Sequence, residues 1–400
     1  LVDTLCREAG KTRAEALISD ILPTLEIVHY IEDNLVEILR PRRRGSPFLY
    51  RGAVSRVEYR PRGVVLVIAP WNNPLQLALV PVVSALAGGN AVILKPSERA
   101  PETGRLVGDL CRRAGFPENA VQVAQGDGRV ARALVEAGPD MIFFTGGTRN
   151  GRAVLASAAE QLIPVILELG GNDPMTVFAD ANVERALGAA VFGAFSHAGQ
   201  HCVSTKRLYV EADLATLFLE RLTASTQELA AGSEWGQVVD RRAAEHARAQ
   251  VKDALDNGGQ LLVPSDVTNA GIEPTVVVVD DHSLRIMQEE TFAPVLGVQT
   301  FRGEDEAVER ANDSAYGLNA SVWTQSQERA ERVASRLVTG NVFINDVLTN
   351  IGNPGLPFGG VRHSGIGRYH GPEGLRAFCH EISVMRSRIG SSREPHWFPR

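Results

Sequence analysis

Short runs of Val, Ile and Leu alternate with helical stretches along the chain from residue 63 onward. This alternation is typical of a parallel β-sheet whose strands are joined by crossover helices. The first five runs cover residues 64–69, 91–94, 120–124, 141–144 and 164–167. Five strands separated by four helical segments predict a doubly wound, Rossmann-type nucleotide-binding sheet.

A second alternation follows Gly170 and predicts a second α/β domain. Its expected strands cover residues 175–178, 207–210, 260–263, 275–279, 295–301, 320–323 and 342–345. Its expected helices cover residues 183–195, 214–229, 241–255 and 327–337. At the N-terminus, apolar residues at helical spacing over 12–38 predict a helix that packs on the first sheet.

Length and charge limit the function classes. A chain of 400 residues exceeds what one hydrophobic core usually organises, so two domains are expected. The net charge of -6, with acidic and basic residues interspersed, argues against a nucleic-acid partner. The basic cluster at residues 40–44 lies beside Pro41 and Gly45 and is interpreted as a solvated loop.

The stretch 63–94 carries no charged residue, yet Pro70, Pro74 and Pro81 divide it into short elements, so no membrane association is expected. The four cysteines show no CxxC pairing and no metal-ligand spacing. This pattern argues against a metal site or a secreted disulfide framework and favours a cytoplasmic location.

Several polar segments lie where predicted strands end, which is where open α/β sheets bind their ligands. The amide of Asn72 can donate to a developing oxyanion, although for this segment taken alone an Asn-Pro turn with a structural role is the favoured explanation. Glu98 can accept hydrogen bonds from a ribose, with Lys95 as a further donor, or the segment is an ordinary polar loop. Gly146 and Gly147 let backbone amides approach a pyrophosphate at a helix N-terminus.

Cys202 follows a Gly-Gln turn after a predicted helix and is a candidate nucleophile, although free cysteines are more often inert core residues. The inert interpretation is kept for Cys6, Cys111 and Cys379, which lie in helical or apolar surroundings. The neighbouring histidines, at 197 and 201, are interpreted as local hydrogen-bonding residues.

Seven segments, taken in their order along the chain, resemble the aldehyde dehydrogenase superfamily. They are Pro70-Trp71-Asn72, Lys95 to Glu98, Phe144-Thr145-Gly146, Glu168-Leu169-Gly170-Gly171, Gly199-Gln200-His201-Cys202, Glu289-Glu290-Thr291-Phe292-Ala293-Pro294 and Pro357-Phe358-Gly359-Gly360. The resemblance covers nearly the whole chain. The later segment from Gly365 to Gly371 is similar to the class 3, fatty and coniferyl aldehyde branch, which favours a hydrophobic or aromatic aldehyde.

By this resemblance Cys202 is the nucleophile, Glu168 is the general base that activates water, and Asn72 forms the oxyanion hole together with the backbone N–H of Cys202. The implied reaction is NAD(P)-dependent oxidation of an aldehyde to a carboxylic acid through a thiohemiacetal and a thioester on Cys202. The implied cofactor is NAD, with NADP possible, because Glu98 suits a ribose 2'-hydroxyl. The implied cofactor-binding residues are Trp71, Lys95, Ser97, Glu98, Thr145, Gly146, Gly147, Leu169, Glu290 and Phe292.

The resemblance also implies an aldehyde dehydrogenase-like α/β fold with three parts. A dinucleotide-binding domain is expected at 1–42 and 62–170, a catalytic domain at 171–378, and a β oligomerisation arm with a C-terminal tail at 43–61 and 379–400. Residues 382–388 alternate like a strand. In similar enzymes such a strand joins a hairpin, here near 46–61, and extends the sheet of a neighbouring subunit, so a homodimer or homotetramer is expected.

Two other functions stay open. One is a coenzyme A-acylating aldehyde dehydrogenase, in which a thiol replaces water at deacylation; the presence of Glu168 favours hydrolysis. The other is a scaffold that binds a dinucleotide without turnover, and the retained Cys202, Glu168 and Asn72 argue against it. Three departures from the family pattern are a short N-terminal part, a short loop between Leu229 and Arg241, and Gly147 where many relatives have a serine.

Overall fold

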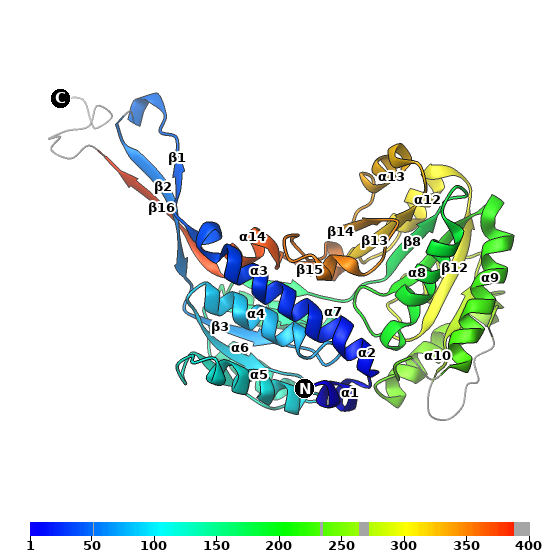
Figure 1. Ribbon diagram of the computed structural model, residues 1–400, viewed down its shortest axis with the longest axis horizontal. Coiled ribbons are helices and arrows are strands. Elements are labelled where there is room, and N and C mark those ends of the chain that lie inside the picture. Colours follow the sequence, from blue (N-terminus) through cyan, green and yellow to red (C-terminus); the bar gives the residue numbers. More distant parts are fainter. Residues whose placement is uncertain (51, 233–234, 264–271, 388–400) are drawn as a thin grey trace.

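The computed structural model describes residues 1–50, 52–232, 235–263 and 272–387. Two large sheets lie side by side, each covered by helices, and a small three-stranded sheet projects from them (Figure 1). The domain boundaries expected from the sequence stay predictions.

The first large sheet contains the five predicted parallel strands. They are β3 Val64–Ile68, β4 Ala91–Lys95, β5 Val121–Val123, β6 Met141–Thr145 and β7 Val165–Glu168. The helices that connect them are α4 Gln76–Ala87, α5 Pro101–Arg113, α6 Gly128–Glu136 and α7 Thr148–Ala159. Because helices cover both faces, the central strands are buried on both sides and consist of continuous apolar runs.

A sixth strand completes this sheet and was not predicted. The two-residue strand β15, Gly365–Ile366, pairs antiparallel with β7 and places Gly365 opposite Glu168. The sheet order is β15-β7-β6-β3-β4-β5. The C-terminal part of the chain therefore closes the edge of the N-terminal sheet, beside the predicted general base.

The predicted N-terminal helix is present but interrupted. It consists of α2 Arg13–Ala16, the π-helical turn η1 Leu17–Ile21 and α3 Leu22–Leu39, and α1 Val2–Ala9 precedes it. Thr12 and Glu15 form a capping box at its start. Pro23 has no N–H for an i→i−4 hydrogen bond, which explains why the helix widens just before it. Ile27 and Ile31 pack in the core of the first sheet, as expected.

The second large sheet has the order β10-β11-β12-β9-β8-β13-β14. Its strands are β8 Asp173–Val177, β9 Thr205–Glu211, β10 Gln260–Leu261, β11 Thr275–Val278, β12 Val295–Phe301, β13 Asn319–Trp323 and β14 Asn341–Ile344. The helices of this region are α8 Val183–Phe195, α9 Ala212–Ala231, α10 Arg241–Asp256, α11 Arg285–Gln288, α12 Gly303–Asn312 and α13 Gln327–Ala334, followed by α14 Gly371–Ala377. Every strand predicted for the second α/β domain is present in this sheet, and all pair in parallel except the short edge strand β10.

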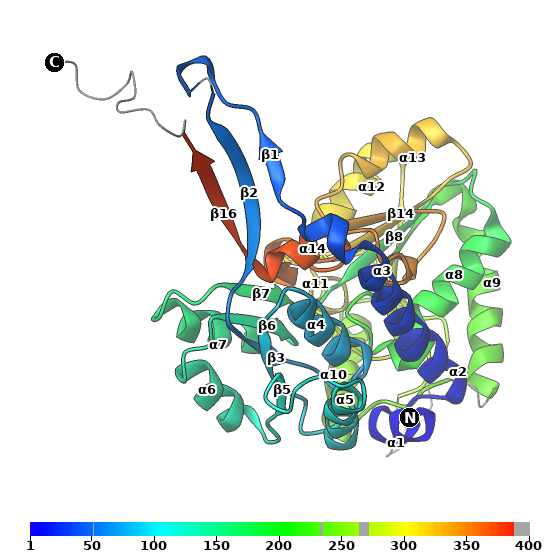
Figure 2. The same ribbon diagram turned by 60° about the vertical axis from the view of Figure 1, so that its left-hand side comes forward.

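The projecting sheet has the order β1-β2-β16 (Figure 2). Its strands are β1 Arg42–Arg44, β2 Val54–Pro61 and β16 Cys379–Arg386. The expected solvated loop at residues 40–44 is wrong in part, because Arg42–Arg44 pairs with residues 55–57 of β2 as a largely exposed edge strand. The expected late strand is present but begins at Cys379, and residue 388 lies outside the described residues.

Short turns of 3-10 helix lie at η2 Phe48–Tyr50, η3 Ser196–Gly199, η4 Thr349–Gly352 and η5 Arg362–Ser364. Among the described residues, no helix combines the length and the apolar character that a bilayer crossing requires. The uncharged stretch 63–94 forms β3, α4 and β4.

Candidate active site

A cavity of about 210 Å³ lies between the two large sheets, at the carboxyl ends of β3, β6 and β7. It is lined by Pro70, Trp71, Asn72, Leu77, Thr145, Gly146, Gly147, Glu168, Leu169, Gly170, Cys202, Glu290 and Phe292. These include all the predicted site residues except Lys95, Ser97 and Glu98. Residues more than two hundred positions apart in the sequence thus meet at one place.

The turn that presents Cys202 has an unusual backbone. After α8, His197 and Ala198 take left-handed conformations with φ of 50° and 53°, and Gly199 follows with φ of 66°. A Cβ atom on Gly199 would lie 2.4 Å from the backbone oxygen of Ala293, so only glycine fits there. Non-glycine residues held in this region store strain, which is common at functional sites.

The side chain of Lys206, in β9, holds this turn in place by hydrogen bonds to backbone oxygens. Its Nζ atom is buried and donates to the backbone oxygens of Gly199, at 2.8 Å, and Ala293, at 2.7 Å. Burial lowers the pKa of Lys206 to about 7, while Glu290 and Asp173 act in the opposite direction. Lys206 therefore joins the nucleophile turn to the segment that carries Phe292.

Cys202 is half-buried. Its raised pKa favours the protonated thiol over the thiolate. Burial is the main reason that the pKa of Cys202 lies well above its usual value, and the carboxylate of Glu168 adds to the shift. A base must therefore take the proton before the sulfur becomes nucleophilic.

Glu168 ends β7 and is 1% exposed. Among the described residues, neither of its carboxyl oxygens has a hydrogen-bond partner of regular geometry. Burial raises the pKa of Glu168 to about 8; the nearby Cys202 thiol counteracts part of this shift and Glu290 adds to it. A carboxyl group with a pKa near neutral pH suits general base catalysis.

Asn72 lies beside the nucleophile turn and is 4% exposed. Its Nδ2 atom donates to the backbone oxygen of Gln200 at 2.9 Å, which holds the amide next to Cys202. An amide carries two N–H groups, so one remains for an oxyanion.

A second buried carboxyl group, Glu290, lies on the other side of the cavity. Its Oε1 atom accepts a hydrogen bond from the backbone N–H of Gly171 at 3.1 Å. Burial raises its pKa to about 7, although this hydrogen bond and Lys206 act against the shift. Beside it, Phe292 has a positive φ of 50° and packs edge-on against Trp71, with ring centroids 5.9 Å apart.

The region around α7 fits a dinucleotide. Gly147 is the N-cap of α7, and a Cβ atom placed there would meet nothing within 4 Å. The Oγ1 atom of Thr145 is buried with no hydrogen-bond partner among the described residues. Open space, free helix N–H groups and an unpaired hydroxyl are the features that a pyrophosphate requires. At the end of β4, Lys95 is buried and lies 3.5 Å from the carboxylate of the exposed Glu98, outside the small cavity.

A buried polar network behind Asn72 was missed by sequence reasoning. Lys11 donates to Asp20 at 2.7 Å and also to Asn73, and both side chains of the Lys11–Asp20 pair are fully buried. Asn73 in turn lies 3.1 Å from Nδ1 of His201. No motif marked Lys11 or Lys206; Lys206 lies between Thr205 and Arg207, just before the strand predicted at 207–210.

The other cysteines lie away from this cavity. Cys111 and Cys379 are buried, and burial raises the pKa of both thiols. Of the two predicted hydrogen-bonding histidines, His201 contacts Asn73. The ring nitrogens of His197 have no hydrogen-bond partner of regular geometry among the described residues, although the ring packs against Trp71 and His201. Burial lowers the pKa of His197 well below the usual value.

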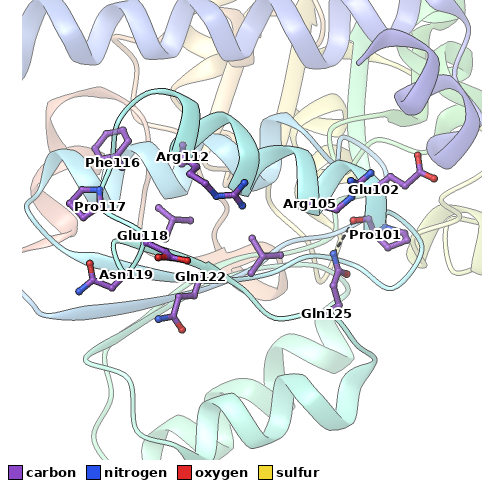
Figure 3. Close-up of a pocket in the computed structure, with 14 residues that line it drawn as sticks. Pro101, Glu102, Arg105, Arg112, Phe116, Pro117, Glu118, Asn119, Gln122 and Gln125 are labelled. Carbon is purple, nitrogen blue, oxygen red and sulfur yellow. Dashed lines mark hydrogen bonds between the residues drawn. The ribbon is translucent and has the colours of Figure 1, made fainter.

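A larger hollow of about 950 Å³ lies at the outer edge of the first sheet, between α5 and β5 (Figure 3). Gln125 donates to the backbone oxygen of Pro101 across one end of it. Arg105, Arg112 and Glu118 line it, and none of the predicted site residues does. Although this hollow is larger, it contains none of the residues predicted to act in the reaction, so the small cavity is the better candidate for the active site.

Comparisons with known proteins agree with the geometry of the small cavity. The sequence model of the aldehyde dehydrogenase family matches residues 1–384. The chain is 44% identical over 404 residues to a 4,4'-diapolycopene aldehyde oxidase of a Methylomonas species, covering all of this chain and 76% of that protein. It is 34% identical over 410 residues to a putative NADP-dependent succinate-semialdehyde dehydrogenase of Mycobacterium bovis, covering all of this chain and 79% of the relative.

The fold matches solved structures equally well. The crystal structure of an NAD-dependent aldehyde dehydrogenase from Sinorhizobium meliloti superposes with a TM-score of 0.93 at 32% identity, covering all of this chain and 80% of that one. The resemblance inferred from the seven sequence segments is thereby confirmed, as is the α/β fold with Rossmann-like parallel sheets. The chain belongs to the aldehyde dehydrogenase family, and is an NAD(P)-dependent oxidoreductase that acts on aldehydes.

Proposed function

We propose that this chain oxidises an aldehyde to a carboxylic acid through a covalent thioester on Cys202, with Glu168 as the general base. The observation that carries the proposal is the buried Glu168 carboxyl group, with a pKa of about 8, beside a thiol that needs a base. The same cavity contains Asn72, whose amide is held against the nucleophile turn.

In the first half of the reaction, Glu168 accepts the thiol proton and the sulfur of Cys202 attacks the aldehyde carbon. The carbonyl oxygen becomes an oxyanion, which the Asn72 amide and the backbone N–H of Cys202 stabilise. NAD or NADP, when bound, supplies the hydride acceptor for this carbon. Before the second half, Glu168 releases the thiol proton to solvent. It then takes a proton from water, the hydroxide attacks the thioester carbon, and the C–S bond breaks, which frees the acid and returns Cys202 as a thiolate.

The cofactor-binding roles follow the positions of the side chains. Lys95, Ser97 and Glu98 would hold the adenosine ribose at the end of β4, and Thr145 with Gly146 and Gly147 would hold the pyrophosphate at the start of α7. Four residues that line the cavity, Trp71, Leu169, Glu290 and Phe292, would position the nicotinamide half. Glu98 favours NAD through the ribose 2'-hydroxyl.

We further propose that the chain forms a homodimer or homotetramer through the projecting sheet and acts in the cytoplasm. Among the described residues β16 is an edge strand of the projecting sheet, so its outer backbone groups can pair with the sheet of another subunit. Light scattering at micromolar concentration should show a dimer or tetramer; a stable monomer would contradict this assembly.

The reaction is tested by separating its two halves. The Glu168→Gln variant should give a burst of NADH, followed by hydrolysis slowed by roughly 10²- to 10⁴-fold, the usual worth of a general base. Because Glu168 also deprotonates the thiol in this scheme, the burst itself should be slower than in the parent. Intact-protein mass spectrometry should show an acyl adduct that persists on Glu168→Gln and is absent when Cys202 is replaced by Ala.

Normal turnover by Cys202→Ala would refute the proposal. Acceleration by added coenzyme A would favour the acylating alternative, and cofactor binding without NADH formation would favour the scaffold.

A further inference from the structure

A second cavity, of about 880 Å³, is lined by the residues that precede and follow Cys202 in the sequence. Its wall comes from the N-terminal helices, from α8 and the turn after it, from α9 and from the loop after β14. It is lined by Thr12, Ala14, Glu15, Ile18, Ser19, Pro23, Asn73, Gly188, Val191, Phe192, Phe195, Ser196, His201, Val203, Ser225, Leu229, Trp235, Leu348, Thr349, Gly352 and Asn353. Its volume is within the range of pockets that enclose whole small-molecule ligands.

The two cavities share no lining residue, but both border the segment 201–203. His201 and Val203, which flank Cys202 in the sequence, line the large cavity, whereas Cys202 lines the small one. In the same way, Asn73 lines the large cavity and Asn72 the small one. The large cavity therefore borders the segment that carries Cys202, and its lining does not include Gly147 or any residue of α7.

The lining of the large cavity is mainly apolar. Ile18 and Phe192 are exposed, Val191 is partly buried, and Phe195 is buried. No Lys or Arg is present among its described lining residues. The only carboxylate among them, Glu15, accepts hydrogen bonds from Thr12 and from the backbone N–H of His197. Burial lowers the pKa of His201 to about 3, so this side chain is neutral near pH 7.

The buried amino group of Lys11, behind the cavity wall, is already paired with a carboxylate. Lys11 lies behind Asn73, with its Nζ atom engaged by Asp20, Ser19 and Asn73. A carboxylate at the far end of a substrate would find no counter-ion among the described residues of the cavity and would face Glu15. Burying an unpaired charge is costly, whereas burying hydrocarbon is favourable.

We propose that the substrate is a long apolar aldehyde with no carboxylate. Its hydrocarbon chain fills this cavity while its carbonyl group reaches Cys202. This inference rests on the proposed function. This inference distinguishes between the two kinds of relative. It places the chain with the oxidase of a polyene aldehyde and apart from the succinate-semialdehyde dehydrogenases.

A substrate series tests the inference directly. NADH formation is measured with propanal, hexanal, decanal, a conjugated polyenal and succinate semialdehyde, with butanal as the uncharged match for the last. The value of kcat/KM should rise with chain length by up to about fourfold per methylene, the limit set by the transfer of a buried CH₂ from water. Butanal should exceed succinate semialdehyde by at least about tenfold, because the extra carboxylate is unpaired.

Gly188 offers a matched pair of variants. It lies in α8 on the cavity wall, and a Cβ atom placed there would meet nothing within 4 Å. Gly188→Leu should lower the decanal-to-propanal ratio of kcat/KM by about tenfold by filling space. Gly188→Ala is the control, because it also removes a glycine from the helix but fills little of the cavity. It should change this ratio by less than twofold. In the opposite direction, Ile18→Arg should raise kcat/KM for succinate semialdehyde.

The outcomes are distinguishable. Equal kcat/KM across chain lengths, or a preference for succinate semialdehyde in the parent enzyme, overturns the inference and leaves the proposed function intact. If no aldehyde gives NADH or an acyl adduct on Cys202, the proposed function fails and this inference fails with it.

Discussion

The buried carboxyl group of Glu168 should make the protein less stable as the pH rises. In the unfolded chain its pKa is the usual 4.5, whereas in the folded protein it is about 8 because burial disfavours the charged form. Between these values the folded state holds a proton that the unfolded state has released. Burial of Glu168 therefore costs the fold little at pH values below 4.5, where the carboxyl group is protonated in both states. As the pH rises from 4.5 toward 8, the free energy of unfolding falls.

The size of the effect follows from the two pKa values. A tenfold change in proton affinity corresponds to about 1.4 kcal/mol, so the cost of burying Glu168 is about 1 kcal/mol at pH 5 and about 4 kcal/mol at pH 8. The Glu168→Gln side chain has the same shape and cannot ionise. The variant should therefore gain about 3 kcal/mol relative to the parent between these two pH values.

Thermal unfolding of both proteins without cofactor, from pH 5 to pH 8, measures this difference. For a chain of this length we expect on the order of 1–2 °C per kcal/mol, so the Tm of the variant should rise relative to the parent by about 3–6 °C over the series. The matched control is Glu220→Gln in α9, an exposed site where the Tm difference should not depend on pH. A Tm difference for Glu168→Gln that is flat with pH, or that falls, would refute the reasoning.

The other predictions concern activity, a buried ion pair and the cofactor. Thioester hydrolysis should accelerate as the pH rises through about 8, because Glu168 must be unprotonated to accept a proton, and stopped-flow measurements on Glu168→Gln should lose this dependence. Lys11→Met should lower the free energy of unfolding by about 3–5 kcal/mol in urea titrations, since it leaves Asp20 buried without its cation. Adding Asp20→Asn, which keeps an acceptor for the backbone N–H of Gln76, should recover part of the loss, and no recovery would contradict the pairing. Glu98→Gln should raise the NADP-to-NAD ratio of kcat/KM, and an unchanged ratio would exclude a ribose contact.

The strands of both large sheets were predictable because their burial on two faces requires continuous apolar runs. The grouping of Cys202, Glu168 and Asn72 around one cavity was predictable for a different reason. Each lies in a segment with a recognisable local pattern at the end of a strand or a helix. Position at the end of an element is a local property, so the sequence records it.

Contacts between distant segments could not be predicted. The strand Gly365–Ile366 is too short to show any periodicity, and its partner in β7 lies far away in the sequence. Lys11 gives no local sign that its side chain ends at Asn73, 62 residues later. The three arginines of β1 look solvated, and they are; only their pairing with β2 makes them a strand.

The pairing of β15 with β7 also orders events during synthesis. The strand that carries Glu168 leaves the ribosome about 200 residues before Gly365 does, which at usual translation rates is about 10–40 s. Until then the edge of β7 is open, and the backbone N–H of Leu169 lacks its 3.0 Å bond to Ser364. A nascent chain thus carries base and nucleophile without the strand that fixes the base. A stop codon shortly before residue 364 should silence the enzyme because it removes β15 together with α14 and β16, although every residue that lines the cavity around Cys202 precedes it.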